Sequence, residues 1–330
     1  MKQLIIPAFG LDNLAFRDVP EPSPGRGEVL VEVKAVALNY RDLLVAKGFY
    51  NPKMSLPRVP CSDAAGVVIG IGEGVTEVKL SDRVCSTFFQ DWESGSITDA
   101  AGNSALGGAI DGVLAERIIL NERGVVPMPE HLSFDEAATL PCAALTAWNA
   151  LSNIRPGQSI LVQGTGGVSL FALQFAVAMG AKVFVTSSDD AKLAKALALG
   201  ATAGTNYRTQ PDWDKWAKEQ TGEGVDLVVE VGGAGTLDRS VKAVQPGGEI
   251  ALIGVLAGGS TFNPLAMMMK SVTLRGIYVG NREMFLAMNT FFADHKLKPI
   301  IDRVFPLAEA PEAFRYLETA KHFGKVVIAL

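Results

Sequence analysis

The residues with the most specific chemical pattern form a glycine-rich segment, GTGGVS at 164–169. Its spacing is G-x-G-x-x-S, directly after an apolar run that predicts a strand and directly before a run that predicts a helix. Gly164 permits a tight turn, and Gly166 lets the backbone approach a pyrophosphate. Gly167 and Val168 open the predicted helix, whose free N–H groups and positive dipole end attract phosphates. Such a triplet alone is also typical of a close-packed turn, but its position between a strand and a helix favours a dinucleotide site.

Two serines follow the second strand of this predicted unit, where a site for NAD usually presents an acidic residue to the ribose hydroxyls. Ser187 and Ser188 occupy that position, and their hydroxyl groups can donate hydrogen bonds to a 2′-phosphate. Lys192 lies one helical turn further, and Tyr207 follows the third strand. The aspartates at 189–190 count against a phosphate, but they stand where a helix starts and acidic residues cap N–H groups. The pattern therefore predicts NADP(H) as the cofactor.

The composition favours a folded enzyme with a small-molecule substrate. The chain has 330 residues, of which 48% are hydrophobic, and a net charge of -5, so it is long enough for two cores. The charge balance offers no footprint for nucleic acid or for an anionic membrane. The first residues lack the pattern of a secretory signal, and no uncharged apolar run is long enough to span a bilayer. We therefore expect a cytoplasmic protein whose three cysteines are reduced.

The order of the predicted elements indicates an α/β fold with two domains. The first part of the chain is rich in short β-like runs separated by Pro, Gly and Asp. From residue 159 onward, apolar strands alternate with helix-length segments, which is typical of a doubly wound parallel sheet. The tail returns to strand-like runs around one helix. We therefore predict a β-rich catalytic domain from residues 1–125 and 297–330, and a Rossmann domain that binds NADP(H) from residues 126–296.

A helix is predicted where the β-rich pattern ends. Ser133 and Glu136 have the spacing of a capping box and are followed by apolar residues at helical intervals. Pro141 stands inside this segment, and proline cannot donate the backbone hydrogen bond that a continuous helix needs. We expect the helix to bend or to restart at this position.

Motifs spread along nearly the whole chain resemble the medium-chain dehydrogenase/reductase superfamily, and specifically its zinc-independent quinone-oxidoreductase-like branch. The resemblance implies a split GroES-like catalytic domain, a Rossmann cofactor domain, and homodimers formed through an edge strand, here the segment TLRGIYVG at 273–280. Each motif is modest, but their order and spacing together are specific. Besides the glycine turn, they are GEVLV at 27–31, NYRD at 39–42, GEGV at 72–75, DRV at 82–84, LTAW at 145–148 and HFGKVVI at 322–328.

The same resemblance argues against a catalytic metal. Zinc-dependent members carry a cysteine at the position of Asn39, a His-Glu pair at the position of residues 62–63, and a third ligand near Cys142. Only the cysteine at the third position is present. Zinc takes about four N, S or O ligands in tetrahedral geometry, and the three histidines show no ligand spacing with any cysteine. We expect no metal site.

Without a Lewis acid, hydride transfer requires hydrogen-bond donors aimed at the developing negative charge. This favours an acceptor that spreads its charge, such as a conjugated enone, a quinone or a related carbonyl compound. Tyr50 resembles the tyrosine that donates the proton in some enoyl-thioester reductases of the superfamily, although an ordinary loop tyrosine has the same sequence pattern. The resemblance places Asn39 near the nicotinamide ribose and Thr146 against the nicotinamide, unless the Thr146 hydroxyl bonds to its own helix. Gly254 and Lys325 complete the predicted cofactor contacts.

Two other functions remain open. An alcohol dehydrogenase would regain a metal through Cys142, Asp63 and one further residue. A protein that binds NADPH without catalysis would keep the glycine turn and lack turnover. Fold resemblance constrains the cofactor better than the acceptor, so the sequence alone predicts an oxidoreductase with an unidentified small-molecule substrate.

Overall fold

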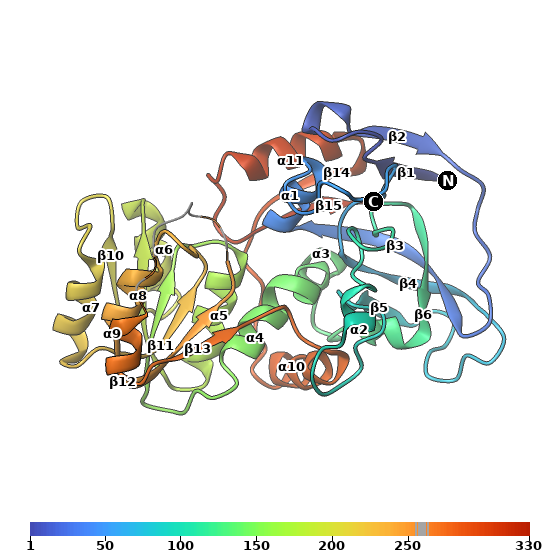
Figure 1. The fold of residues 1–330 in the computed structure, drawn as a ribbon. Coiled ribbons are helices and arrows are strands. Elements are labelled where there is room, and N and C mark those ends of the chain that lie inside the picture. Colours follow the sequence, from blue (N-terminus) through green and yellow to red (C-terminus); the bar gives the residue numbers. More distant parts are fainter. Residues whose placement is uncertain (255, 257–261, 263) are drawn as a thin grey trace. The chain divides into compact units, whose positions relative to one another are not determined.

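The structure is a computed structural model that describes residues 1–254, 256, 262 and 264–330. The chain forms two compact units, which are coloured along the sequence in Figure 1. Unit 1 comprises residues 1–145 and 280–330, and unit 2 comprises residues 146–279. The predicted boundaries, at 125/126 and 296/297, assign more residues to the cofactor-binding unit than the structure does. The difference arises because α3 (Phe134–Ala138) and α10 (Arg282–Asp294) pack with the strands of unit 1.

Unit 1 is built around a seven-stranded sheet with the order β14-β15-β3-β4-β5-β7, in which β6 also pairs with β3. Neighbouring strands are antiparallel except for β14 and β15. A separate antiparallel pair is formed by β1 and β2. The tail of the chain therefore joins the β-rich unit, as predicted. The strands are β1 (Lys2–Ile5), β2 (Ala15–Asp18), β3 (Glu28–Leu38), β4 (Asp63–Ile71), β5 (Arg83–Ser86), β6 (Arg117–Asn121), β7 (Val125–Pro127), β14 (Ile301–Pro306) and β15 (Lys325–Ala329).

The capping box predicted at Ser133 is confirmed. The Ser133 hydroxyl accepts from the Glu136 N–H at 3.2 Å, and the Glu136 carboxylate accepts from the Ser133 N–H at 2.8 Å. The restart at Pro141 is also confirmed, because a π-helical turn, η3 (Leu140–Ala144), separates α3 from α4 (Leu145–Ala150). The remaining helical elements of unit 1 are η1 (Leu11–Asn13), α1 (Tyr40–Ala46), α2 (Asp99–Gly102), η2 (Glu122–Gly124), η4 (Leu307–Glu309) and α11 (Ala310–Glu318).

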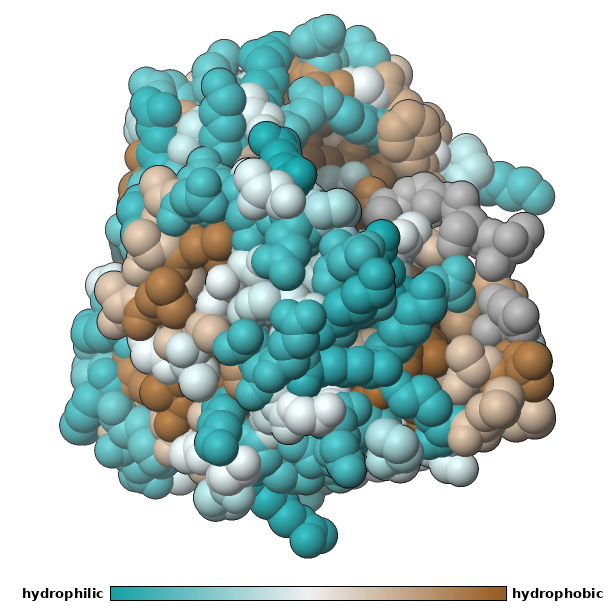
Figure 2. All heavy atoms as spheres, turned by 90° about the vertical axis from the view of Figure 1, so that its left-hand side faces the viewer, coloured by the Kyte–Doolittle hydropathy of each residue, from teal (hydrophilic) through white to brown (hydrophobic). Residues whose placement is uncertain are grey.

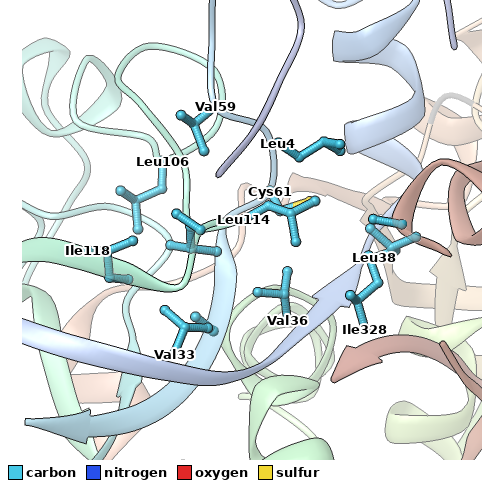
Figure 3. Packing of buried hydrophobic residues seen from close by; sticks show 14 of the residues in the cluster. Leu4, Val33, Val36, Leu38, Val59, Cys61, Leu106, Leu114, Ile118 and Ile328 are labelled. Carbon is cyan, nitrogen blue, oxygen red and sulfur yellow. The ribbon is translucent and has the colours of Figure 1, made fainter. Parts of the chain in front are cut away.

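Apolar side chains from several strands meet in the core of unit 1. Figure 3 shows Leu38 of β3 beside Ile328 of β15, and Val36 of β3 near Cys61, which precedes β4; Val33 lies further along β3. In β3 the charged residues Glu28, Glu32 and Lys34 are partly exposed, and all other residues are buried. Burial of apolar surface stabilises such a sheet by about 25 cal/mol per Å². The core thereby fixes the ends of β3 and β15, which carry the polar residues described below.

Unit 2 is a six-stranded parallel sheet with the order β10-β9-β8-β11-β12-β13, and helices lie on both of its faces (Figure 1). This order is that of a doubly wound dinucleotide-binding domain, and the predicted Rossmann sheet is confirmed. Its central strands β8, β9 and β11 are almost entirely buried, because both faces of the sheet are covered there. The elements are β8 (Ser159–Gln163), α5 (Gly167–Ala178), β9 (Lys182–Ser187), α6 (Asp190–Ala198), β10 (Ala203–Asn206), α7 (Trp213–Thr221), β11 (Val225–Glu230), α8 (Leu237–Ala243), β12 (Val244–Leu252), α9 (Leu265–Met269) and β13 (Thr273–Gly276).

One face of the molecule is mostly polar. On the face drawn in Figure 2, hydrophilic residues predominate and hydrophobic residues form small separate groups. Within the described part of the chain, no helix has the length and hydropathy required to cross a membrane.

Candidate functional site

The glycine turn lies at the carboxyl edge of the sheet of unit 2, between the end of β8 at Gln163 and the start of α5 at Gly167. Gly164 has a φ of 72°, which favours glycine. A Cβ atom added at Gly164 or Gly166 would meet no heavy atom within 4 Å, so the backbone borders open space there. The first N–H groups of α5, those of Gly167 and Val168 among them, have no partner within the helix. This arrangement fits a pyrophosphate.

The third glycine of the usual turn motif is replaced by Ser169, and the structure shows why a serine fits. Its side chain is buried, and its hydroxyl donates to the carbonyl oxygen of Gln163 at 2.7 Å. This hydrogen bond ties the first turn of α5 to the end of β8. A small polar residue therefore keeps the helix and the strand close together, as the sequence predicted.

A buried carboxylate that the sequence analysis missed holds the residue that precedes the glycine turn, Gln163, in place. Glu230, at the end of β11, accepts hydrogen bonds from Gln163 Nε2 at 2.7 Å, from Thr236 Oγ1 at 2.5 Å and from the Ser240 hydroxyl. It also accepts from the backbone N–H groups of residues 232–233 at 2.8 and 2.9 Å. Five donors therefore surround one carboxylate. Polar residues at the ends of two neighbouring apolar strands were the available sequence signal.

The predicted site for the adenosine end of the cofactor lies where β9 and β10 end. Ser187 is buried, and its hydroxyl accepts from the Asp189 N–H at 3.3 Å, whereas Ser188 is half-buried. Tyr207 is 41% exposed, and its N–H donates to the Ser187 carbonyl oxygen at 2.9 Å. Lys192 is half-buried in the first turn of α6. The structure thus brings all four predicted residues to one edge of the sheet.

Asp189 caps α6, as the sequence analysis allowed. Its carboxylate accepts from the N–H groups of Ala191 at 2.8 Å and Lys192 at 3.1 Å. These backbone hydrogen bonds, that of Lys192 foremost, lower the pKa of Asp189. Charge interactions with the Lys192 ammonium and the Arg208 guanidinium act in the same direction. The Asp189 carboxylate is therefore engaged by backbone N–H groups of α6, and it interacts electrostatically with the side chains of Lys192 and Arg208.

Two further predicted contacts of unit 2 have packing roles in the described structure. A Cβ atom added to Gly254 would lie 1.7 Å from the Val231 carbonyl oxygen, so only glycine fits this close approach. The Gly254 N–H also donates to the Glu230 carbonyl oxygen at 3.1 Å. Thr146, in α4, is buried. Contact of either residue with the cofactor stays a prediction.

Unit 1 contains a second buried polar group, formed where β3 ends and β4 and β15 begin. The Lys325 side chain is 3% exposed, and its ammonium group donates to the Leu38 carbonyl oxygen at 2.7 Å and to Asn39 Oδ1 at 2.6 Å. Its Nζ atom lies 4.0 Å from Asp63 Oδ2. Asp63 also accepts from the Ser62 hydroxyl at 2.5 Å and from the Cys142 N–H at 3.1 Å. We call Asn39, Ser62, Asp63, Cys142 and Lys325 the Asp63 cluster.

The pKa values of the buried carboxyl groups reflect their surroundings. Burial raises the pKa of Asp63, and the charge of Lys325 partly opposes this. Burial also raises the pKa of Asp42, to about 6, against the opposing charge of Arg41. Asp42 lies in the first turn of α1, and its Oδ2 accepts from the Asn39 N–H at 2.8 Å. Asn39 Nδ2 and Asp42 Oδ1 are buried and have no hydrogen-bond partner in the structure. The cluster therefore has unused hydrogen-bonding capacity.

Tyr50 lies in the loop that follows α1, and its side chain is 41% exposed. The Arg41 Cζ atom lies 5.2 Å from the centroid of its ring and 4.5 Å from that of Phe88. The Arg41 Nη1 atom donates to the Leu106 carbonyl oxygen at 2.7 Å. Because Arg41 is in the first turn of α1, the loop returns Tyr50 toward the end of the helix that carries Asn39. The structure thus places both predicted catalytic residues beside the first turn of α1.

The three cysteines are free thiols. Burial raises the pKa of Cys61, Cys85 and Cys142, and the charge of Asp63 acts in the same direction on each. A thiol with a raised pKa stays protonated at neutral pH and is a poor nucleophile. None of the three therefore has the character of a catalytic cysteine.

A cavity of about 160 Å³ in unit 2 lies at the amino edge of the sheet, away from the glycine turn. Gln158, Asp226, Gln245 and Glu249 are among its lining residues. Asp226 accepts from the Ser159 N–H at 2.7 Å and from Gln245 Nε2 at 2.9 Å. Because these polar groups already satisfy one another, we interpret the cavity as a packing feature.

Comparison with known proteins agrees with this architecture. Residues 25–130 match the family described as the alcohol dehydrogenase GroES-like domain, and residues 167–294 match the family described as zinc-binding dehydrogenase. A zinc-type alcohol dehydrogenase-like protein of Schizosaccharomyces pombe is 42% identical over 97% of this chain and 96% of that protein. The crystal structure of an NAD-dependent alcohol dehydrogenase, 35% identical, superposes with a TM-score of 0.92 and full coverage of both chains.

A more distant relative carries another activity in its name. An acryloyl-coenzyme A reductase of Metallosphaera sedula is 29% identical over 94% of this chain and 95% of that protein. These similarities extend over both units and agree with the glycine turn and with the order of the parallel strands. The chain belongs to the medium-chain dehydrogenase/reductase superfamily of oxidoreductases, which bind a nicotinamide cofactor.

Proposed function

We propose that the protein is an NADPH-dependent reductase that transfers hydride to a conjugated enone, a quinone or a related carbonyl acceptor without a catalytic zinc ion. The observation that carries this proposal is the composition of the Asp63 cluster. Where zinc-dependent relatives place metal ligands, this chain has an amide, a hydroxyl and a carboxyl group that are already hydrogen-bonded to other groups of the protein.

The residues present do not fit a zinc ion. Asn39 Oδ1 accepts from an ammonium group, Ser62 donates its hydroxyl hydrogen to Asp63, and Asp63 Oδ2 accepts from the Cys142 N–H. Zinc requires deprotonated thiolate, neutral imidazole or carboxylate ligands in tetrahedral geometry. Within the described ranges, no three His, Cys, Asp or Glu side chains are grouped so that they would hold a metal ion. We therefore derive no catalytic step through zinc.

The carboxyl edge of unit 2 fits a dinucleotide with a 2′-phosphate. The open backbone at Gly164 and Gly166 and the first N–H groups of α5 would hold the pyrophosphate. Ser188 and Lys192 would hold the 2′-phosphate, since the end of β9 presents no carboxylate and Asp189 is engaged as a helix cap. When bound, NADPH supplies the hydride. The chain's contribution at this edge is to bind and orient the cofactor.

We further propose that Tyr50 supplies the proton that completes the reduction. Hydride addition to the electron-poor carbon of a conjugated acceptor leaves negative charge on its oxygen, and a proton must then reach the product. A phenol can donate this proton once and can regain it from water. The Tyr50 ring is partly exposed and lies against the Arg41 guanidinium, which orients the ring. The name of the Metallosphaera relative, an acryloyl-coenzyme A reductase, supports this assignment, since an acryloyl thioester is a conjugated acceptor.

The second candidate function is that of an alcohol dehydrogenase. The names of two similar proteins favour it, one a zinc-type alcohol dehydrogenase-like protein and the other an NAD-dependent alcohol dehydrogenase. For this function the chain would oxidise alcohols with NAD, and a metal site would have to form from residues that are engaged elsewhere in the described structure. We rank it second because of those competing hydrogen bonds.

We also propose a homodimer formed through β13. This strand is at the edge of the sheet of unit 2, and Tyr278, two residues after its end, is 42% exposed. An edge strand with free backbone groups can pair with the same strand of a second copy. Size measurement in solution at several protein concentrations would test this, and a monomer throughout would refute it.

Cofactor oxidation tests the proposed function. NADPH and NADH are compared with a panel of enones, quinones, an acyl-thioester and simple aldehydes, with alcohols tested in the reverse direction. We expect NADPH oxidation with the conjugated acceptors and weak activity with alcohols. The variants Ser187→Asp and Ser188→Asp should each weaken NADPH far more than NADH, because either carboxylate would lie beside the proposed 2′-phosphate site. Equal loss with both cofactors would place the 2′-phosphate elsewhere, and alcohol oxidation that depends on zinc would favour the second candidate.

A further inference from the structure

We propose that Lys325 replaces a metal ion as the fixed positive charge of the Asp63 cluster, and that it is a positioning residue which sets the orientation of the Asn39 side-chain amide. This inference deepens the proposed function, and its catalytic consequence rests on that function. Its structural part does not, because it concerns contacts within unit 1 alone. The two parts can therefore fail separately.

The position of the ammonium group is fixed by the sheet. Lys325 is the first residue of β15, whose next residue, Val326, pairs with Leu38 at the end of β3. The Lys325 N–H donates to the Ile300 carbonyl oxygen at 2.9 Å, and its ammonium group donates to the Leu38 carbonyl oxygen. The side chain is 3% exposed, so it is almost fully shielded from water. The charge is thus held in place by backbone groups that cannot move without disturbing the sheet.

The chemistry of this contact determines the orientation of the amide. An ammonium group can only donate hydrogen bonds, so the amide atom 2.6 Å from Nζ must be the Asn39 oxygen. The amide nitrogen is then the other terminal atom. It is buried and has no partner at hydrogen-bond distance, although it faces the Asp63 carboxyl group and lowers the pKa of that group. The Asn39 backbone is held by Asp42, and an amide nitrogen carries two N–H donors, so at least one of them stays unused. The side chain therefore keeps an unused donor in one fixed orientation, which a ribose hydroxyl or a developing oxyanion can accept.

The same ammonium group excludes a metal ion. A zinc ion bound to Asn39 Oδ1 would lie about 2.0–2.2 Å from that oxygen, which the Lys325 ammonium already approaches to 2.6 Å. The ion and the ammonium would then be close neighbours in a buried site, where two positive charges repel strongly. Asp63 Oδ2, at 4.0 Å from Nζ, faces the ammonium as well. The cluster thus contains one cation, and that cation is covalently part of the chain.

The charged groups around the cluster are consistent with a single internal cation. Arg41 and Lys325 are the positive groups, and Asp42 and Asp63 are the negative groups, that act on one another there. Addition of a divalent ion would leave this group with excess positive charge in a buried region, which is costly. Removal of Lys325 alone would instead leave the Asp63 carboxyl group without its cation. The variants below use this difference.

The main experiment compares Lys325→Met with the double variant Lys325→Met/Asp63→Asn. The double variant keeps the shape of the cluster and removes both charges, so we expect it to recover much of the stability that the single variant loses. We expect kcat with NADPH to stay on the order of 100-fold below wild type in both variants, because the Asn39 amide is no longer held. KM should change less than kcat. A double variant with wild-type kcat would overturn the positioning role.

Lys270→Met is the matched control. The Lys270 ammonium also donates to backbone carbonyl oxygens, those of Val241, Lys242 and Val244, but it belongs to unit 2 and is not part of the Asp63 cluster. We expect this variant to lose stability and to keep its kcat with saturating NADPH. If Lys270→Met lowered kcat as much as Lys325→Met, the loss would reflect general destabilisation and the positioning role would be refuted.

Metal content tests the replacement independently of turnover. The purified wild-type chain is incubated with excess zinc sulfate, dialysed and measured by elemental analysis. We expect far less than one zinc ion per chain. Retention of about one zinc ion per chain after dialysis would overturn the inference. This readout applies even if no acceptor in the panel is reduced, so failure of the proposed function and failure of the inference remain distinguishable.

Discussion

Each of the two units buries a carboxyl group at one terminus of a strand, Glu230 as the last residue of β11 and Asp63 as the first residue of β4, and the two groups are stabilised in different ways. In unit 2, Glu230 accepts hydrogen bonds from three side chains and two backbone N–H groups, all of them neutral. In unit 1, Asp63 has two neutral donors and the Lys325 ammonium at 4.0 Å. Of these two carboxyl groups, Asp63 is the one whose neighbours include buried polar atoms without a partner at hydrogen-bond distance, Asn39 Nδ2 and Asp42 Oδ1 among them.

This difference distinguishes a hydrogen-bond network that stabilises the fold, around Glu230, from a group of residues that can act on a ligand, around Asp63. A carboxylate surrounded by neutral donors is fully satisfied and rigidifies its region, since any lost partner leaves a buried polar group unpaired. The Glu230 network therefore holds β8, β11 and the glycine turn in fixed geometry. The Asp63 cluster instead combines charge with unused hydrogen-bonding capacity, which is typical of residues that act on a ligand. The comparison predicts that changes at Glu230 affect stability first and that changes near Asp63 affect function first.

The largest effect is expected for Glu230→Ala. This change leaves several buried donors without an acceptor, and each costs about 1–3 kcal/mol. We expect the free energy of unfolding to fall by at least about 3 kcal/mol, measured by chemical denaturation. Glu230→Gln should cost less because one acceptor oxygen remains. Glu219→Ala, at an exposed position of α7, is the control and should be nearly neutral. A loss at Glu230 no larger than at Glu219 would contradict the structural role.

Asp42→Asn should change the pH dependence of stability. Burial raises the pKa of Asp42 from 3.8 to about 6 in the folded chain. Below pH 3.8 the Asp42 carboxyl group is protonated in both the folded and the unfolded chain. Between pH 3.8 and about 6 the unfolded chain releases this proton while the folded chain keeps it, so the free energy of unfolding decreases as the pH rises. The stability of wild type relative to Asp42→Asn should therefore fall by up to about 3 kcal/mol across this range. Denaturation curves between pH 4 and 7 measure it, and parallel pH profiles would contradict the raised pKa.

Gly166→Ala should weaken cofactor binding without unfolding the protein. The added methyl group enters the open space beside the turn, so it strains no packing but occupies room that a pyrophosphate needs. We expect NADPH affinity to fall roughly tenfold, as measured by fluorescence titration. Gly102→Ala also adds a methyl group in open space, in unit 1, and should leave affinity unchanged. Equal affinities for both variants would remove the glycine turn from the binding site.

The smallest effect is expected for Lys192→Ala. Loss of one partly exposed cation should weaken NADPH binding about fivefold, because an exposed ion pair contributes up to about 1 kcal/mol. Binding of NADH, which lacks the 2′-phosphate, should not change. Lys195→Ala, one turn further along α6 and exposed, is the matched control. If Lys192→Ala weakened both cofactors equally, the lysine would not contact the 2′-phosphate.

Local patterns predicted much of the fold. The capping box at Ser133, the helix restart at Pro141 and the order of strands and helices after residue 159 depend on neighbours within a few residues, and all three are present. The limits of the units were harder to place. Asn289 and Arg282 of α10 donate to carbonyl oxygens of β7, and such long-range contacts leave no local pattern.

The candidate site was predictable in part. The glycine turn and the residues at the ends of β9 and β10 could be located because parallel strands end at one edge of a sheet. The contact between Lys325 and Asn39 joins residues 286 positions apart, and only the pairing of β15 with β3 brings them together. The five donors of Glu230 are likewise spread over several elements. Their hydrogen bonds require the folded chain.

The central claim is that this chain reduces a conjugated acceptor with NADPH and without metal. The most direct test measures NADPH oxidation by protein whose zinc content has been determined, before and after treatment with a chelator. The account predicts turnover with an enone or a quinone by protein without zinc, at a rate that the chelator does not change. Loss of turnover on removal of a stoichiometric zinc ion, with activity restored by zinc, would contradict it.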